Sequence, residues 1–220
     1  MKFYSFWRSL ASFRVRIALN LKNLPHEVVH VDIDSSEQRG EAYASLNPQM
    51  ALPALVLDDE TVLTESLAIL DYLEETSPEP PLLPSDSKGR ARVRALAQIV
   101  ACDAHPLTVP RVQRYLAETL KLDDTQKAAW LRHWTLEALT VLEAQLAGSP
   151  ASGRFCHGDT PTIADICLVG HVTFAIAQEI DLSLTPTVKR IFQTAMALPA
   201  FARAHPLAQP DAPEQLRIQL

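Results

Sequence analysis

Residues 51–76, ALPALVLDDETVLTESLAILDYLEET, contain the signals of two short strands and a helix in direct succession. Pro53–Leu57 and Thr61–Leu63 are apolar runs of strand length, and they flank Asp58-Asp59-Glu60, a segment rich in turn-forming residues. Apolar residues then recur at helical spacing over Glu65–Glu75. The stretch therefore predicts a β-hairpin followed at once by a helix.

The residues before this stretch alternate between strand and helix patterns. Lys2–Phe6 and Val28–Ile33 are predicted strands, and Ser12–Lys22 between them has the apolar spacing of a helix. Ser36–Leu46 is polar and fits a helix more weakly. The order over residues 1–76 is therefore β-α-β-α-β-β-α, which predicts an α/β domain.

A proline-rich segment, Ser77-Pro78-Glu79-Pro80-Pro81-Leu82-Leu83-Pro84, is the clearest boundary in the chain. Its prolines cannot continue a helix or join the interior of a sheet, so they predict a stiff, extended connector. No convincing strand follows this connector. Helical patterns cover Ser87–Thr119, Asp124–Leu146, Ile163–Ala177 and Pro186–Leu198.

We therefore expect an α/β domain over residues 1–80, a linker over 81–87 and an all-helical domain over 88–220. Ile163–Ala177 is apolar on nearly every side, which predicts the buried centre of the helical domain. Thr162 and Asp165 at its start have the spacing of a capping box. The proline-rich tail from Pro206 is expected to be loosely ordered.

Composition narrows the class of protein. Residues 1–80 hold 6 Lys and Arg against 13 Asp and Glu, which argues against nucleic acid or an anionic membrane as a partner. No apolar run approaches the ~20 residues that span a bilayer, and Met1–Ser5 lacks the features of a secretory signal. Cys102, Cys156 and Cys167 have no zinc-ligand spacing, so no metal is expected, and Cys102 and Cys167 fit as small buried hydrophobes. These features predict a globular protein of the cytoplasm.

Several motifs appear in an order and spacing that, taken together over the whole chain, are specific for one family. They are Phe6-Trp7-Arg8-Ser9, Arg14-Val15-Arg16-Ile17-Ala18-Leu19, Leu46-Asn47-Pro48, Leu52-Pro53-Ala54-Leu55, Glu65-Ser66 and Gly158-Asp159-Thr160-Pro161-Thr162-Ile163-Ala164-Asp165. Through them the chain resembles the glutathione transferase family, and within it the zeta type. The resemblance implies a thioredoxin-like first domain that binds glutathione and a helical second domain that binds substrate.

The catalytic serine that this resemblance implies is Ser9. A thiol with a pKa of about 8.5 is only slightly ionised at neutral pH, so a site that uses the thiolate must stabilise the anion. A hydroxyl donor at the N-terminus of a helix does so through a hydrogen bond and through the positive end of the helix. Ser9 and Ser12 both precede the predicted helix Arg14–Leu21. We expect Ser12 to cap that helix and Ser9 to contact the thiol.

The resemblance also assigns the rest of the glutathione site. It implies that the Leu52–Pro53 bond is cis and that the backbone of Leu52 pairs with the peptide backbone of glutathione. Glu65 and Ser66 open a helix whose hydroxyl and free N–H groups suit the γ-glutamyl carboxylate. His105 matches the position that binds the glycine end of glutathione, although a lone helical histidine is as often structural.

Arginines are the predicted substrate ligands, because zeta isomerases act on dicarboxylates and arginine grips a carboxylate with two hydrogen bonds. Arg8 matches the family's motif arginine, and Arg111 lies on the helix expected to face the substrate; an ordinary solvated ion pair is the alternative for each. Leu10 and Ala11 stand where the zeta signature Ser-Ser-Cys has two polar residues, and we expect them to line the substrate pocket. Maleylpyruvate isomerases also depart from the signature here. An arginine expected within Phe174–Asp181 is absent.

The first functional hypothesis is a glutathione-dependent cis–trans isomerase of maleyl-type keto diacids, either maleylacetoacetate or maleylpyruvate. Glutathione would act as a cofactor through its thiolate, while Arg8 neutralises carboxylates and developing charge. A transferase or dehalogenase that joins glutathione to apolar electrophiles is the alternative, which Leu10 and Ala11 favour. A non-catalytic ligand-binding protein of the same fold is a third possibility. A homodimer is expected from the resemblance.

Overall fold

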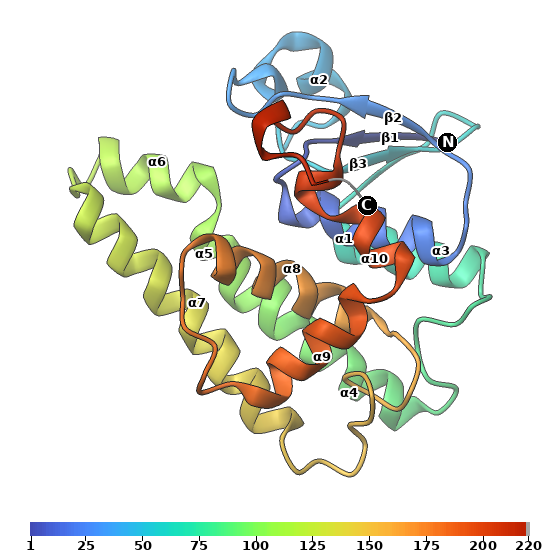
Figure 1. The fold of residues 1–220 in the computed structure, drawn as a ribbon. Coiled ribbons are helices and arrows are strands. Elements are labelled where there is room, and N and C mark those ends of the chain that lie inside the picture. Colours follow the sequence, from blue (N-terminus) through green and yellow to red (C-terminus); the bar gives the residue numbers. More distant parts are fainter. Residues whose placement is uncertain (219–220) are drawn as a thin grey trace. The chain divides into compact units, whose positions relative to one another are not determined.

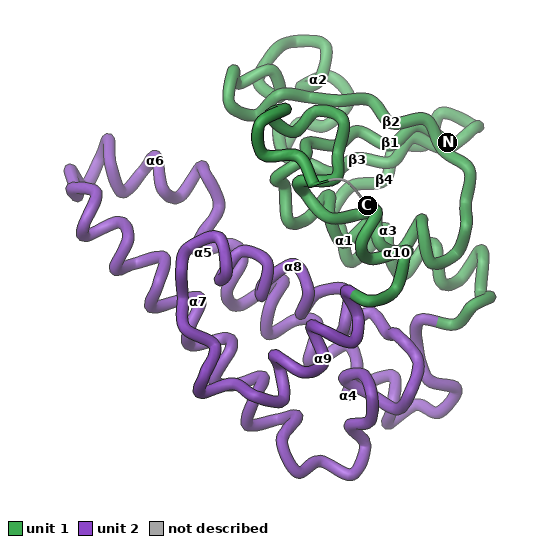
Figure 2. Tube along the Cα trace, in the orientation of Figure 1, with its two compact units in different colours: residues 1–81, 197–220 green, residues 82–196 purple. Residues whose placement is uncertain are grey.

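The computed structural model of the chain describes residues 1–218 and divides into two compact units (Figure 2). The first unit consists of Met1–Pro81 together with the segment from Ala197 onward. The second unit consists of Leu82–Met196. The first contains a sheet and helices and the second contains helices, so the expected fold class of a thioredoxin-like domain followed by a helical domain is confirmed.

The first unit is built on a sheet of four strands in the order β2-β1-β3-β4. β1 (Lys2–Ser5) pairs in parallel with β2 (Glu27–His30), because the helix between them returns the chain to the same end of the sheet. β3 (Ala54–Val56) pairs antiparallel with β1 and, through the predicted hairpin, antiparallel with β4 (Val62–Thr64). The element order predicted for residues 1–76 is therefore present.

Helices cover both faces of this sheet (Figure 1). On one face lies α2 (Glu41–Leu46), which follows the short 3₁₀ turn η1 (Glu37–Arg39). A cluster with buried Phe6, Tyr43 and Leu52 forms the core on that side. On the other face lie α1 (Leu10–Leu21) and α3 (Ser66–Thr76), and α1 contacts both α3 and α10 (Pro199–Ala204).

The C-terminal segment differs from its expected place. Residues 88–220 were expected to form the helical domain, but the segment from Ala197 onward packs with the first unit. Two polar side chains of α1 explain this, because Arg16 Nε donates to the carbonyl of Ala204 at 3.0 Å and Asn20 Nδ2 donates to that of Ala200 at 3.0 Å. Beyond them come two ordered 3₁₀ turns, η3 (Pro206–Ala208) and η4 (Glu214–Leu216), where a loose tail was expected.

The second unit is a helical bundle. Its helices are α4 (Ser87–Gln98), η2 (Ile99–Ala104), α5 (His105–Thr108), α6 (Pro110–Glu118), α7 (Asp124–Leu146), α8 (Ile163–Ala177) and α9 (Pro186–Met196). α8 contacts α4, α7 and α9, and the side chains along most of its length are buried. The prediction that Ile163–Ala177 forms the buried centre of this unit is therefore confirmed.

The continuous helical pattern predicted over Ser87–Thr119 is interrupted in the structure. η2 is a π-helical segment that ends just before Pro106, whose missing N–H leaves a carbonyl of the preceding turn without its usual donor. Val109 is extended, with ψ of 155°, because the residue before Pro110 avoids the helical region. The predicted pattern is thus present as four consecutive helical pieces, α4, η2, α5 and α6, and Pro110 begins the last of them.

The described residues contain no helix long and apolar enough to cross a membrane. Within residues 1–218 no three His, Cys, Asp or Glu side chains are grouped in a way that could hold a metal ion. Cys156 and Cys167 are buried and form no disulfide within residues 1–218, whereas Cys102 is exposed on the π-helical segment and is not the buried hydrophobe that the pattern predicted.

Candidate functional site

Three loops of the first unit meet at one end of the sheet. The register pairs Tyr4 near the end of β1 with Ala54 at the start of β3, and Ala54 with Thr64 at the end of β4. The residues that follow β1, precede β3 and follow β4 must therefore lie close together. The sequence predicted Ser9, Leu52-Pro53 and Glu65-Ser66 in these three places as parts of one site.

Ser9 is the N-cap residue of α1, with an extended backbone (φ −66°, ψ 114°). Its Oγ accepts a hydrogen bond from the backbone N–H of Ser12 at 3.2 Å. The expectation that Ser12 caps this helix is therefore wrong: α1 begins earlier than predicted, and Ser12 is fully buried with no partner for its Oγ within residues 1–218. The Ser9 hydroxyl proton lies at the positive end of α1 and can be donated to an anion.

The Leu52–Pro53 peptide bond is cis, as the family resemblance implied. The loop before it is fixed by α2 and the residue that follows α2. Tyr43 Oη and Asn47 Nδ2 both donate to the carbonyl of Ala51, each at 2.8 Å, and burial raises the pKa of Tyr43 to about 12, so this phenol remains a donor. Asn47 of the Leu46-Asn47-Pro48 motif therefore orients the segment that presents the backbone of Leu52.

Glu65 and Ser66 begin α3 in a backbone conformation that is costly. Glu65 has φ of 63° and ψ of 114°, a region in which non-glycine residues cost about 1–3 kcal/mol and which is concentrated at functional sites. Ser66 is buried, and its Oγ accepts a hydrogen bond from Arg14 Nη1 at 3.2 Å. Because that oxygen accepts from Arg14, the hydroxyl proton of Ser66 remains available to donate to an anionic group at the start of α3.

Arg8 lies in the same loop as Ser9 and forms an ion pair with Asp34. The two side chains are about half exposed, at 51% and 50%, and the guanidinium stacks over the ring of Phe6 at 5.8 Å from its centroid. The solvated ion pair that was the alternative for Arg8 is thus present. A pair this exposed contributes little to stability. Leu10 and Ala11, in the first turn of α1, are partly exposed.

The two other predicted ligands belong to the second unit. His105 is partly buried and begins α5, directly after the π-helical segment. Arg111 is exposed near the start of α6. Their roles in binding glutathione and substrate remain predictions.

Three charged residues around the site were not predicted to act there. Arg14 and Arg16 were noted only as parts of a family motif, yet both are almost fully buried and donate to polar groups of the first unit. Their signal in the sequence is the placement of two arginines within an otherwise apolar turn of a helix, which demands buried acceptors. Asp34, the partner of Arg8, had no signal of this kind.

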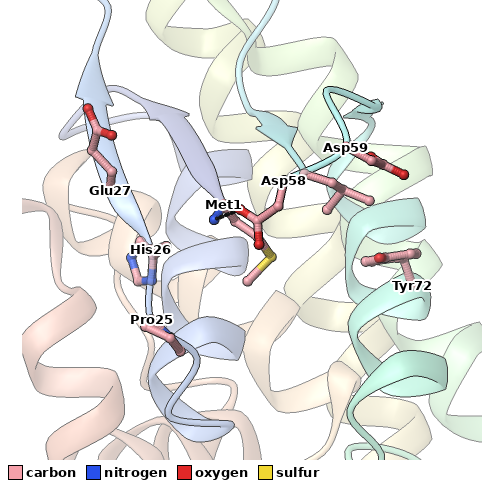
Figure 3. Close-up of a pocket in the computed structure, with 8 residues that line it drawn as sticks. Met1, Pro25, His26, Glu27, Asp58, Asp59 and Tyr72 are labelled. Atoms are coloured by element: carbon pink, nitrogen blue, oxygen red, sulfur yellow. Dashed lines mark hydrogen bonds and ion pairs between the residues drawn. The ribbon is translucent and has the colours of Figure 1, made fainter.

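A cavity of about 790 Å³ lies at the opposite end of the sheet (Figure 3). It is lined by Met1, Pro25, His26, Glu27, Leu57, Asp58, Asp59 and Tyr72. The amino terminus, which precedes β1, forms an ion pair of 2.7 Å with Asp58 in the turn after β3. Since Ser9 follows β1 and Pro53 precedes β3, this cavity is separate from the Ser9 site.

Comparisons with known proteins identify the family of this chain. The glutathione S-transferase N-terminal domain family matches residues 3–81, and the corresponding C-terminal domain family matches residues 135–208. The maleylpyruvate isomerase of Ralstonia sp is 45% identical over 96% of this chain and 100% of its own length. The chain therefore belongs to the glutathione S-transferase family.

Two solved structures narrow the class. The holo structure of a maleylpyruvate isomerase described as a bacterial zeta-class glutathione S-transferase has a TM-score of 0.94 at 45% identity, covering 97% of this chain and 100% of that one. The maleylacetoacetate isomerase of Methylobacterium extorquens AM1, with bound malonate and glutathione, has a TM-score of 0.95 at 49% identity with the same coverage. Within its family the chain is of the zeta type.

Proposed function

We propose that this protein is a glutathione-dependent cis–trans isomerase of maleyl-type keto diacids, maleylacetoacetate or maleylpyruvate. The observation that carries the proposal is similarity over the full length to isomerases of both substrates, at 45% and 42% identity for the enzymes of Ralstonia sp and Pseudomonas aeruginosa. The donors gathered around Ser9 at one end of the sheet supply the chemistry that such an enzyme needs.

The described residues fit glutathione as a cofactor. Its anionic groups require donors, and the first unit offers the hydroxyls of Ser9 and Ser66 together with the first N–H groups of α1 and α3. The backbone of Leu52, beside the cis bond, suits an extended peptide. His105 of the second unit is proposed for the glycine carboxylate.

When bound, glutathione supplies a thiolate that adds to the substrate double bond, permits rotation about the resulting single bond and leaves again. Ser9 donates a hydrogen bond to the sulfur and so keeps it ionised at neutral pH. Ser66 and the start of α3 hold the γ-glutamyl carboxylate, and Glu65 opens that helix. Arg8 binds a substrate carboxylate and stabilises the negative charge that develops on the substrate, and Arg111 is proposed as a further substrate ligand.

A conjugating transferase or dehalogenase is the second candidate. The observation that favours it is the pair Leu10 and Ala11, which gives the first turn of α1 an apolar, partly exposed surface next to Ser9. An apolar electrophile would pack there without needing a counter-charge.

A turnover assay of the purified protein separates these functions. With glutathione present, we expect isomerisation of maleylpyruvate or maleylacetone to be much faster than conjugation of a chlorodinitrobenzene-type electrophile. Rapid conjugation without isomerisation would show that the protein is a conjugating transferase or dehalogenase. Binding of glutathione with no turnover of any substrate would indicate a ligand-binding protein.

Replacing Arg8 by lysine tests how the substrate carboxylates are bound. Lysine keeps the charge that pairs with Asp34 but loses the two-pronged geometry, so we expect KM for a dianionic maleyl substrate to rise about tenfold. The affinity for glutathione should change little. Arg39→Lys, at an exposed arginine of the same unit, is the matched control. An unchanged KM would reduce Arg8 to a surface ion pair.

A homodimer is proposed as the working assembly. Light scattering at micromolar concentration should give about 49 kDa, twice the 24.3 kDa of one chain. The acidic residues 1–80 would meet basic residues of the second unit, such as Arg90 on α4. Arg92, on the same helix, instead donates to the carbonyl of Cys156 at 2.6 Å within its own unit. A mass of one chain that persists at high concentration would reject the dimer.

A cytoplasmic location is proposed as well. Cys102, Cys156 and Cys167 form no disulfide within the described residues, which fits a reducing compartment. Glutathione is abundant in its reduced form under the same conditions.

A further inference from the structure

The loop that carries Arg8 and Ser9 is held by a residue from the far end of the chain. The backbone N–H of Trp7 donates to Asp211 Oδ2 at 2.8 Å, although the two residues are 204 positions apart. His30 Nδ1, at the end of β2, lies 3.2 Å from the same oxygen. The Asp211 side chain is only 15% exposed, so this contact is largely shielded from water.

Arg16 holds the same loop by donating hydrogen bonds to carbonyl groups of the loop. Its guanidinium donates to Ser5 Oγ at 3.0 Å, to the carbonyl of Phe6 at 3.2 Å and to the carbonyl of Trp7 at 2.8 Å. Burial lowers the pKa of Arg16 to about 9, and the negative charge of Asp211 opposes that shift. The positive charge of Arg16 and the negative charge of Asp211 therefore stabilise each other, and both residues hold the loop through hydrogen bonds to its backbone.

These contacts continue to Ser9. The carbonyl of Phe6, which accepts from Arg16, also accepts a hydrogen bond from the backbone N–H of Ser9 at 3.1 Å. The peptide groups from Phe6 to Ser9 are thus fixed at an N–H by Asp211 and at two carbonyls by Arg16. The direction of the Ser9 hydroxyl depends on this backbone, and a hydroxyl misplaced by a fraction of an ångström donates a weaker hydrogen bond.

We propose that Asp211 is a positioning residue for the reaction: it fixes the Phe6–Ser9 backbone so that Ser9 and Arg8 point toward glutathione and substrate. The proposal rests on the proposed function for its activity readout. The segment that follows α10 and carries Asp211 therefore helps to position the active-site residues and is not a loose terminus. In this proposal Asp211 acts through the backbone of the loop and not through contact with glutathione or substrate.

Two substitutions separate the hydrogen bond from the charge. Asp211→Ala removes both. Asp211→Asn keeps an oxygen for the N–H of Trp7, and it can place its NH₂ group where Oδ1 lies, since Oδ1 has no hydrogen-bond partner within residues 1–218. Glu214→Gln, at an exposed carboxylate of the same tail, is the matched control.

We expect Asp211→Ala to lower kcat about tenfold, as the loss of one oriented charged hydrogen bond does, while KM for glutathione changes little. The thiol pKa of bound glutathione, read from thiolate absorbance, should rise by about one unit. Amide exchange at Ser9 in the protein without ligand should become faster. Asp211→Asn should give smaller changes of the same sign, and Glu214→Gln should match the unmodified protein.

The outcomes distinguish this proposal from others. If Asp211 only stabilised the fold, Asp211→Ala would lower the melting temperature and leave the thiol pKa and the amide exchange rate of Ser9 unchanged. That result would overturn the proposal. Failure of both Asp211 variants to fold would do the same. If the unmodified protein did not isomerise maleyl substrates, the proposed function would fail, but the thiol pKa and the exchange rate would still decide the role of Asp211.

Discussion

Ser9→Ala should lower turnover about 10²-fold or more while the protein still binds glutathione. Ser9 is the residue proposed to donate to the thiolate, and one oriented donor to an anion in a site shielded from water is worth roughly 3–4 kcal/mol. Backbone contacts at Leu52 and the start of α3 do not involve this hydroxyl, so affinity should be largely retained. Steady-state kinetics with a maleyl substrate and titration of glutathione measure both quantities.

The structure supplies two controls for this variant. Ser9 also caps α1, so losing its Oγ should cost about 1 kcal/mol of stability, whereas glycine at a cap costs only a few tenths. Ser9→Gly should therefore be as inactive as Ser9→Ala but more stable. Ser12→Ala removes a buried hydroxyl with no partner within residues 1–218 and should keep activity. An inactive Ser12→Ala beside an active Ser9→Ala would contradict the assignment.

Asp165→Ala should destabilise the second unit by about 3–5 kcal/mol. The fully buried carboxylate of Asp165 accepts from the backbone N–H of Cys156 at 2.7 Å, from that of Thr162 at 2.8 Å and from Thr162 Oγ1 at 2.7 Å. Burial raises the pKa of Asp165, and these hydrogen bonds oppose the shift. Alanine would leave three buried donors unsatisfied, each costing about 1–3 kcal/mol. Thermal unfolding should show a fall of roughly 10 °C.

The matched control for this prediction is Asp159→Ala. Asp159 is an exposed carboxylate in the same loop and accepts one hydrogen bond, from the backbone N–H of Arg154 at 3.0 Å. Its loss should change stability by less than about 0.5 kcal/mol. Asp165 has no catalytic role in our interpretation, so Asp165→Ala measured well below its melting temperature should keep its turnover. A loss of activity without a loss of stability would contradict that interpretation.

Each predicted site residue of the first unit belongs to a short motif, which is why the family resemblance could assign it from the sequence. Leu52-Pro53 precedes a strand, Glu65-Ser66 precedes a helix, and Ser9 follows a strand, and the strand pairing then brings the three together. The sequence misassigned the cap of α1 because two serines lie within one turn of the helix start. Local propensity does not distinguish the two serines. The burial of Ser12 in the core is what excludes Ser12 as the helix cap.

The sequence by itself determined those helices whose start and end are marked by residues within one or two helical turns. The limits of α7 and α8 agree with the predicted Asp124–Leu146 and Ile163–Ala177, because a capping residue stands at the start of each. Only the tertiary structure decided that the tail joins the first unit and that Asp211 reaches Trp7. A contact between residues 204 positions apart has no local pattern, since it depends on where the whole chain has folded before the two groups can meet.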